Sequence, residues 1–212
     1  MLSVCETFSS IQGESTHAGR PCFFIRLAGC SCSCSYCDTE YAKAPGRDVG
    51  IDELLALARG SGLKLVEVTG GEPMEQAETP LLCRRLLDAG FEVLLETNGT
   101  IPLDTVPSGV RRIVDCKLPG SGMAERNCVC NYGLLGAGDE IKFVVGSRGD
   151  FDHAVGVIGK YRLADRGCEL LFSPVWGKVE FSALAEWVLE SGLPLRMQIQ
   201  LHKVIWGDRR GV

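Results

Sequence analysis

Residues 30–39 read CSCSCSYCDT and place Cys30, Cys34 and Cys37 at CxxxCxxC spacing directly after an apolar segment. A structural zinc ion normally takes four protein ligands, and an iron–sulfur cluster that only carries electrons takes four cysteines. Three thiolates on one loop instead leave a metal coordination position open for chemistry. Cys32 adds a fourth thiol, but it lies too close to Cys34 for the usual pair, so we interpret it as a bystander. The alternative interpretation is a zinc site or ordinary free cysteines.

This loop resembles the cluster-binding loop of the radical S-adenosylmethionine (SAM) superfamily. There, three cysteines hold a [4Fe–4S] cluster, and the fourth iron binds SAM, which is cleaved to methionine and a 5′-deoxyadenosyl radical. Tyr36, which precedes the last cysteine, matches the aromatic position near the adenine. The resemblance implies a [4Fe–4S] cluster and SAM as cofactors, with Cys30, Cys34 and Cys37 as the cluster ligands.

Segments on both sides of the loop narrow the resemblance. They are ETFSSIQGE at 6–14, GRP at 19–21, FIRLAGC at 24–30 and CDT at 37–39. Over nearly the whole chain they resemble the 7-carboxy-7-deazaguanine synthase family. This lyase family converts 6-carboxy-5,6,7,8-tetrahydropterin to 7-carboxy-7-deazaguanine with loss of ammonia, in the biosynthesis of queuosine and related 7-deazapurines. Ser15 and the Ser31-Cys32 pair depart from the family pattern, which affects loop flexibility rather than a ligand position.

Composition favours a small-molecule enzyme. A chain of 212 residues is long enough for one large core and short for two, so we expect a single domain over 1–212. The net charge is −5, and no long run of Lys or Arg is present, which argues against a nucleic-acid partner. No segment approaches the roughly 20 apolar residues that span a membrane, and MLSVCETF lacks the pattern of a signal peptide. We expect a cytoplasmic protein with no membrane partner.

The remaining cysteines favour reduced thiols. Eleven cysteines without an export signal do not indicate a disulfide framework. Single cysteines in strand or helix patterns are expected to be small buried hydrophobes; they are Cys5, Cys22, Cys83, Cys116 and Cys168. Cys128 and Cys130 form a CxC pair that could hold a second metal with Cys116, although a fourth ligand is missing.

From residue 63 onward, short apolar runs alternate with amphipathic stretches about every 25 residues, which predicts βα units around a parallel sheet. The predicted strands are Phe23–Ala28, Leu65–Thr69, Val93–Thr97, Arg112–Lys117, Glu140–Val145, Glu169–Ser173 and Leu195–Leu201. The predicted helices are Ile51–Arg59, Thr79–Ala89, Phe151–Tyr161 and Phe181–Glu190. A complete eight-unit barrel needs about 250 residues. We therefore expect an α/β fold with a partial, open TIM-like barrel, in agreement with the radical SAM core of the family.

Polar motifs follow the predicted strands at their carboxyl ends, the face where barrel proteins build their active sites. Besides the cysteine loop, they are TGGEP at 69–73, ETNG at 96–99, DCK at 115–117, SPVWG at 173–177 and QIQ at 198–200, followed by His202. Gln198, Gln200 and His202 are expected to alternate along the last strand and line one wall. The glycine-rich segment 119–139 is interpreted as an active-site flap with one short helical turn, or as a solvated crossover.

The resemblance assigns roles to individual residues. The expected SAM-binding residues are Tyr36, Cys37, Asp38, Gly71, Glu72, Asp115, Cys116, Lys117, Ser173, Pro174, Val175 and Trp176. The expected substrate-binding residues are Ile11, Gln12, Gly13, Glu14, Arg26, Thr69, Glu96, Asn98, His202 and Val212. Arg26 suits the substrate carboxylate because a guanidinium donates two parallel hydrogen bonds. Thr39 is expected to ligate Mg²⁺, which substrate oxygens and water complete; without the resemblance, Asp38-Thr39 is a helix cap. Lys142 can simply leave the sheet for solvent.

The family also implies an external reductant of the flavodoxin or ferredoxin type and a homodimer. Two other functions stay open from the residues alone. A radical SAM activase would make a glycyl radical on a partner protein, but the compact QGE loop and the 198–202 segment favour a small heterocycle. A non-catalytic metal-binding or electron-transfer module would not need the TGGEP and ETNG motifs.

Overall fold

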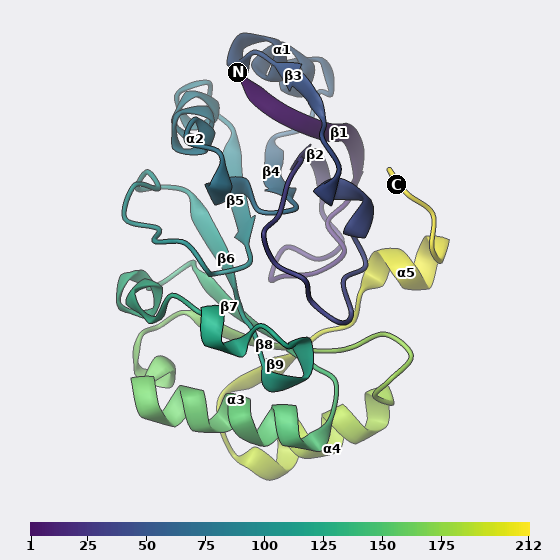
Figure 1. Ribbon diagram of the computed structural model, residues 1–212, viewed down its shortest axis with the longest axis vertical. Coiled ribbons are helices and arrows are strands. Elements are labelled where there is room, and N and C mark those ends of the chain that lie inside the picture. The colour runs from purple at the N-terminus through teal and green to yellow at the C-terminus, as the bar shows by residue number, and fades with distance from the viewer.

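The computed structural model describes residues 1–212 and is built on one nine-stranded sheet with the strand order β3-β1-β2-β4-β5-β6-β7-β8-β9 (Figure 1). Neighbouring strands from β2 to β9 are parallel. They are β2 (Pro21–Leu27), β4 (Leu65–Gly70), β5 (Glu92–Thr97), β6 (Arg111–Cys116), β7 (Glu140–Val145), β8 (Glu169–Pro174) and β9 (Leu195–Met197). Because β3 and β9 stay at opposite edges, the barrel is open, as the sequence predicts.

Two strands precede and flank this parallel set. β1 (Leu2–Ile11) pairs antiparallel with both β2 and β3 (Arg47–Val49). Neither strand is predicted from the sequence, because the pattern that indicates a parallel sheet begins only at residue 63. Most side chains of β1 are only half-buried, so the strand carries Glu, Thr and Ser and lacks an apolar signature.

Helices cover the outer side of the curved sheet (Figure 1). They are α1 (Ile51–Gly60), α2 (Thr79–Asp88), α3 (Arg148–Tyr161) and α4 (Phe181–Ser191). The first turn of α3 is capped by Ser147, whose hydroxyl accepts a hydrogen bond from the Asp150 N–H at 3.2 Å. These helices agree with the amphipathic stretches of the sequence.

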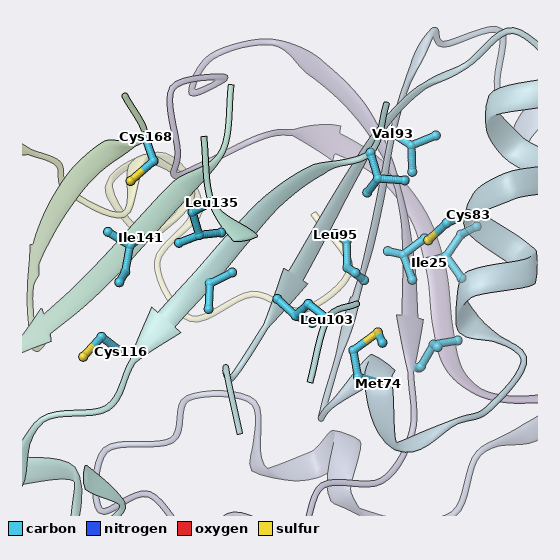
Figure 2. Close-up of a cluster of buried hydrophobic side chains, with 14 of the residues drawn as sticks. Ile25, Met74, Cys83, Val93, Leu95, Leu103, Cys116, Leu135, Ile141 and Cys168 are labelled. Carbon is cyan, nitrogen blue, oxygen red and sulfur yellow. The ribbon is translucent and has the colours of Figure 1, made fainter. Parts of the chain in front are cut away.

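Side chains alternate along each strand between two layers. Outward ones such as Ile25, Val93 and Leu95 join the main core beneath the helices, part of which is shown in Figure 2. Inward ones near the amino ends of the strands form a small apolar plug of Cys22, Phe24, Leu65, Leu94 and Ile113, with Phe8 packed against it. Closer to the carboxyl ends of the strands the inward side chains are polar, and these polar side chains line the lumen of the barrel.

The loop between β1 and β2, residues 12–20, closes the open side of the barrel. The Ser15 N–H donates to Gln198 Oε1 at 2.7 Å, and the Thr16 N–H donates to Glu140 Oε1 at 2.9 Å. The Gly13 carbonyl accepts from the Leu201 N–H at 2.8 Å. The QGE loop thereby ties β1 and β2 to β7 and to the segment after β9.

The prediction of a last strand over Leu195–Leu201 is wrong in its second half. β9 ends at Met197, and a short helix, α5, runs over Leu201–Trp206. The chain leaves the sheet because its next partner is the loop at Gly13 rather than another strand. Gln198 and Gln200 therefore lie in a connection, and His202 lies on α5.

The glycine-rich flap contains three short 3₁₀ turns instead of one, over Pro119–Ser121, Ala124–Arg126 and Val129–Leu134. It packs on the cysteine loop, because Ser35 Oγ donates to the Gly120 carbonyl at 2.7 Å and Arg126 Nη1 donates to the Ser31 carbonyl at 2.8 Å. The segment therefore contacts the cysteine loop, while many of its side chains stay exposed.

Two further observations concern cysteines and membranes. Cys128 and Cys130 form a disulfide, so the expectation of reduced thiols is wrong for this pair, whose sulfurs lie close enough to bond within one turn of the flap. Cys5 is only half-buried, whereas the other single cysteines are buried.

None of the helices is both long and apolar enough to cross a lipid bilayer.

Candidate active site

A cavity of about 730 Å³ opens at the carboxyl ends of the strands. It is bordered by all the expected site residues except Glu72 and Cys116. The alignment of motifs on one rim, inferred from the sequence, is therefore present in three dimensions. Cys32, Tyr41 and Glu67 also border the cavity, although the sequence analysis gave them no role.

The cysteine loop is held by close backbone contacts. The Glu72 N–H donates to the Gly29 carbonyl at 2.8 Å. A Cβ added at Gly71 would overlap that carbonyl oxygen and come within 2.9 Å of the Cys30 Cβ. Only glycine allows the TGGEP turn to approach the cysteine loop this closely.

Cys32 lies inside this loop, only 2% exposed. The Asn98 side-chain amide contacts its sulfur at 3.4 Å and the Cys30 sulfur at 3.7 Å. The Asn98 Oδ1 atom accepts from the Thr100 N–H at 2.9 Å, so this side chain serves the ETNG turn and the cysteine loop together.

Glu72 lies under the rim rather than in the cavity. It is fully buried and accepts hydrogen bonds from the Met74 N–H at 2.9 Å, the Thr97 hydroxyl at 2.7 Å and the Asn98 N–H at 2.6 Å. Burial raises the pKa of Glu72 to about 7 despite these donors. In this structure the side chain ties two rim turns together.

Cys116 points away from the lumen. Its sulfur accepts a hydrogen bond from the Tyr132 hydroxyl at 3.2 Å, and Figure 2 shows it among the buried apolar side chains of the outer core. Asp115 and Lys117, its neighbours in sequence, alternate to the other side and border the cavity. Lys117 Nζ donates to Asp115 Oδ2 at 2.6 Å.

A buried ion cluster forms the floor of the lumen. Lys142, on β7, pairs with Glu14, Glu96 and Asp115, with its Nζ atom 3.1 Å from Glu14 Oε2 and 3.3 Å from Asp115 Oδ1. Burial opposes the ammonium charge, but the three carboxylates outweigh it and raise the pKa of Lys142 well above its ordinary value. The interpretation of Lys142 as a solvent-exposed lysine is wrong, because its side chain is only 8% exposed.

Arg26 lies on β2 and borders the cavity. Its Nε atom donates to Glu6 Oε1 at 2.9 Å, and the Tyr41 hydroxyl donates to the same oxygen at 2.8 Å. The two terminal nitrogens of Arg26 make no hydrogen bond within the protein. Glu6 thus fixes the orientation of the guanidinium, and the two terminal nitrogens of Arg26 stay available to bind an anion.

Side chains of the QGE loop and of β4 are largely engaged within the protein. Gln12 donates through Nε2 to Glu67 Oε2 and accepts through Oε1 from the Glu14 N–H. The Thr69 hydroxyl donates to Glu96 Oε2 at 2.8 Å. Gln12 and Thr69 therefore orient the acidic residues of the lumen, and the carboxylates remain as the acceptors that face it.

The segment after β9 forms the opposite wall. A Cβ at Gly13 would overlap the His202 ring, so this ring packs directly on the QGE loop. Lys203 Nζ, on α5, donates to Asp38 Oδ2 at 2.9 Å and ties the helix to the cysteine loop. Thr39 Oγ1 donates to Asp38 Oδ1 at 3.0 Å and borders the cavity, as does Val212.

The remaining expected SAM residues line the side of the cavity near β7 and β8. The Tyr36 hydroxyl donates to the Val144 carbonyl at 3.3 Å, which fixes the ring beside the cysteine loop. Ser173 Oγ accepts from Gln198 Nε2 at 2.9 Å. Pro174, Val175 and Trp176 follow it along the same rim, and the Trp176 ring is 41% exposed.

An open parallel barrel with three cysteines on the loop after its first parallel strand defines a radical SAM protein. The model of the Radical SAM superfamily matches residues 24–165. Within that superfamily, the chain belongs to the 7-carboxy-7-deazaguanine synthase family. A 7-carboxy-7-deazaguanine synthase of Chlorobaculum tepidum is 46% identical over 100% of this chain and 97% of its own length. One from Koribacter versatilis is 38% identical over 97% of each chain.

Solved structures support the fold. The crystal structure of QueE from Escherichia coli has a TM-score of 0.73 and 23% identity, covering 95% of this chain and 94% of that one. SuiB of Streptococcus suis, solved with its precursor peptide SuiA, has a TM-score of 0.58 and 10% identity, covering 86% of this chain and 49% of its own. At these identities the likeness concerns the fold alone.

Membership of the superfamily brings a [4Fe–4S] cluster and SAM, and the residues present suit both. Cys30, Cys34 and Cys37 all border the cavity on one loop, and the glycines of the TGGEP turn let that turn pack closely against it. No three His, Cys, Asp or Glu side chains are arranged to hold a single metal ion. A four-iron cluster has a different requirement, because each cysteine binds a separate iron.

Proposed function

We propose that the chain converts 6-carboxy-5,6,7,8-tetrahydropterin to 7-carboxy-7-deazaguanine and ammonia. The observation that carries the proposal is the chemistry of the lumen between the cysteine loop and the apolar plug. One guanidinium with a free edge, on Arg26, lies in a cavity that also exposes the carboxylates of Glu14 and Glu96. A pterin that carries a carboxylate and an aminopyrimidine edge has the complementary groups.

Each group of the substrate has a proposed partner. Arg26 binds the substrate carboxylate through its free nitrogens, while Glu6 holds the guanidinium in place. Glu14 and Glu96 accept hydrogen bonds from the N–H groups of the aminopyrimidine. His202 packs on Gly13 and covers the heterocycle from the other wall. These contacts orient the ring for hydrogen transfer, a step that tolerates little misplacement.

Cys30, Cys34 and Cys37 would hold the cluster, and the cluster with bound SAM would supply the radical chemistry that removes hydrogen from C6 of the substrate. The net reaction loses only ammonia, so the chain needs no stoichiometric oxidant. Its own residues bind the substrate, exclude water and fix the reacting carbon.

Further parts of the proposal rest on the family resemblance. They are Mg²⁺ bound by Thr39, an external reductant of the flavodoxin or ferredoxin type, a homodimer and a cytoplasmic location. The SAM-binding roles belong here too. Tyr36, Gly71, Asp115, Lys117 and the 173–176 segment border the cavity. Glu72 and Cys116 would act through backbone groups or through the turns that they stabilise.

The test is turnover by anaerobically reconstituted protein with SAM, dithionite, Mg²⁺ and 6-carboxytetrahydropterin, followed by mass spectrometry. We expect 7-carboxy-7-deazaguanine. Cleavage of SAM without this product would reject the substrate and favour another radical SAM reaction, such as activation of a partner protein. An absence of SAM cleavage by cluster-loaded protein would reject the enzymatic proposal.

A further inference from the structure

Glu67, on β4, is a buried carboxylate of the lumen without an ion-pair partner. Its side chain points inward between the apolar plug and Thr69, and the residue is 2% exposed. The nearby ammonium of Lys142 is shared among Glu14, Glu96 and Asp115 and makes no ion pair with Glu67. A fully buried carboxylate without a cation is costly to keep ionised.

The surroundings of Glu67 favour its neutral form. Burial raises the pKa of Glu67 well above its ordinary value, and the negative charges of Glu96 and Glu14 raise it further. The Gln12 hydrogen bond and the more distant charge of Lys142 oppose this effect without reversing it. On the side of the plug, the Cys22 thiol is itself kept neutral by burial.

The single hydrogen bond of Glu67 fixes which oxygen carries the proton. Gln12 Nε2 donates to Oε2, so this oxygen is the carbonyl-like acceptor. The proton then belongs on Oε1. This second oxygen makes no hydrogen bond within the protein, and it is not among the fully buried atoms that lack a partner, which are Ser10 Oγ, Asp115 Oδ1 and Glu140 Oε2. Since Glu67 borders the cavity, Oε1 faces it.

We propose that Glu67 is a specificity residue that acts as a neutral carboxylic acid and donates a hydrogen bond from Oε1 to the ring carbonyl of the pterin substrate. The proposal rests on the function proposed above. Glu14 and Glu96 accept from N–H groups. The Lys142 ammonium is already paired with Glu14, Glu96 and Asp115, so Glu67 adds a donor that stays available to a ligand. Together they read the amino-oxo edge of the heterocycle and disfavour a ring that lacks the carbonyl.

The experiment measures binding of two air-stable ligands by cluster-loaded protein without dithionite. The ligands are 6-carboxypterin and 2-aminopteridine-6-carboxylate, which lacks the ring carbonyl. Wild-type protein should bind the first about tenfold more tightly, since a buried donor without a partner is costly. E67M should lose the share of this preference that the carbonyl supplies and keep the share that comes from the ring N3–H, which the second ligand also lacks and which Glu14 and Glu96 accept. E67Q should keep most of the preference, because its amide carbonyl still accepts from Gln12 and its N–H replaces the O–H. E125Q, at an exposed residue without side-chain partners, is the matched control.

The outcomes separate the two proposals. If wild-type protein binds neither ligand, the proposed function and the role of Glu67 both fail. If it binds 6-carboxypterin but E67M keeps the full preference, only the role of Glu67 fails. A purely structural effect through Gln12 would weaken both ligands equally in E67M and would also overturn the proposal.

An infrared difference spectrum provides a readout that requires neither ligand nor turnover. Wild-type protein minus E67Q at neutral pH should show the C=O stretch of a protonated carboxylic acid. The presence of carboxylate bands in its place would show that Glu67 is ionised and would overturn the proposal, even if E67M failed to fold.

Discussion

Replacement of Lys142 by Met tests the buried ion cluster beneath the lumen. The side chain of Lys142 is 8% exposed and balances Glu14, Glu96 and Asp115. Methionine has a similar length and fills the space, so the change mainly removes the charge. Removal of one partner from a buried ion pair costs roughly 3 to 5 kcal/mol, because the other charge stays buried. For a chain of this size each kcal/mol lowers Tm by about 2 to 4 °C, which predicts a loss of roughly 6 to 20 °C.

The loss should depend on pH in a defined direction. In wild-type protein, Lys117 and Lys142 hold the pKa of Asp115 below its ordinary value, and K142M removes one of these two cations. The folded K142M protein then holds more protons than the folded wild-type protein, so the loss of stability grows as pH rises through the carboxylate range. The difference from wild-type protein should be small at mildly acidic pH and largest at neutral pH and above.

The assay is urea denaturation of the cluster-free protein under reducing conditions across a pH series. K64M serves as the matched control, because Lys64 is exposed and its side chain makes no hydrogen bond or ion pair. A K142M protein within about 1 kcal/mol of wild type at neutral pH would refute the reasoning, since a buried charge that balances three carboxylates of the lumen costs more to remove. A pH-independent loss would point to packing instead.

Three further predictions concern single positions. C34A should lose the iron–sulfur absorbance on anaerobic reconstitution and C32A should keep it, so loss of the cluster in C32A would overturn the ligand assignment. G71A should bind less iron and sulfide on reconstitution, because its Cβ would overlap the Gly29 carbonyl. Full loading would contradict this prediction and show that the turn shifts to accommodate the Cβ. For wild-type protein, the raised pKa of Glu67 means that the folded state binds more protons. Its stability should therefore fall as pH rises above the ordinary glutamate range, and E67Q should lack this slope in urea denaturation; equal slopes would contradict it.

The barrel and its rim could be predicted from the sequence because both depend on local patterns. LVEVTG and EIKFVV are short apolar runs, and the first of them ends at the TGGEP motif on the rim. Period-two alternation also places Glu67 on the same face of β4 as Thr69, and it places Lys142 on the face of β7 opposite the core residues Ile141 and Phe143. This signal could have identified both as lumen residues. These inward positions lie within the strands, away from the polar motifs at the strand ends that indicate a site.

The partners of these residues could not be predicted in the same way. Arg26 pairs with Glu6 of β1. The polar sequence of β1 does not indicate which of its residues lie opposite which residues of β2. His202 lies on a helix because residues after β9 bind the loop at Gly13, a contact between opposite ends of the chain. Such contacts are decided by closure of the barrel and leave no local periodicity.

The hydrogen bonds of the 12–20 loop determine when the site can exist during synthesis. Ser15 binds a residue 183 positions away, and Glu14 accepts from Gln200, 186 positions away. Long-range contacts of this kind form late, because the chain must first close a large loop. A ribosome therefore releases almost the entire chain before the lumen can close. Until then Cys30, Cys34 and Cys37 lie on a rim whose opposite wall has not yet formed. A cluster that binds in the completed lumen therefore binds after translation.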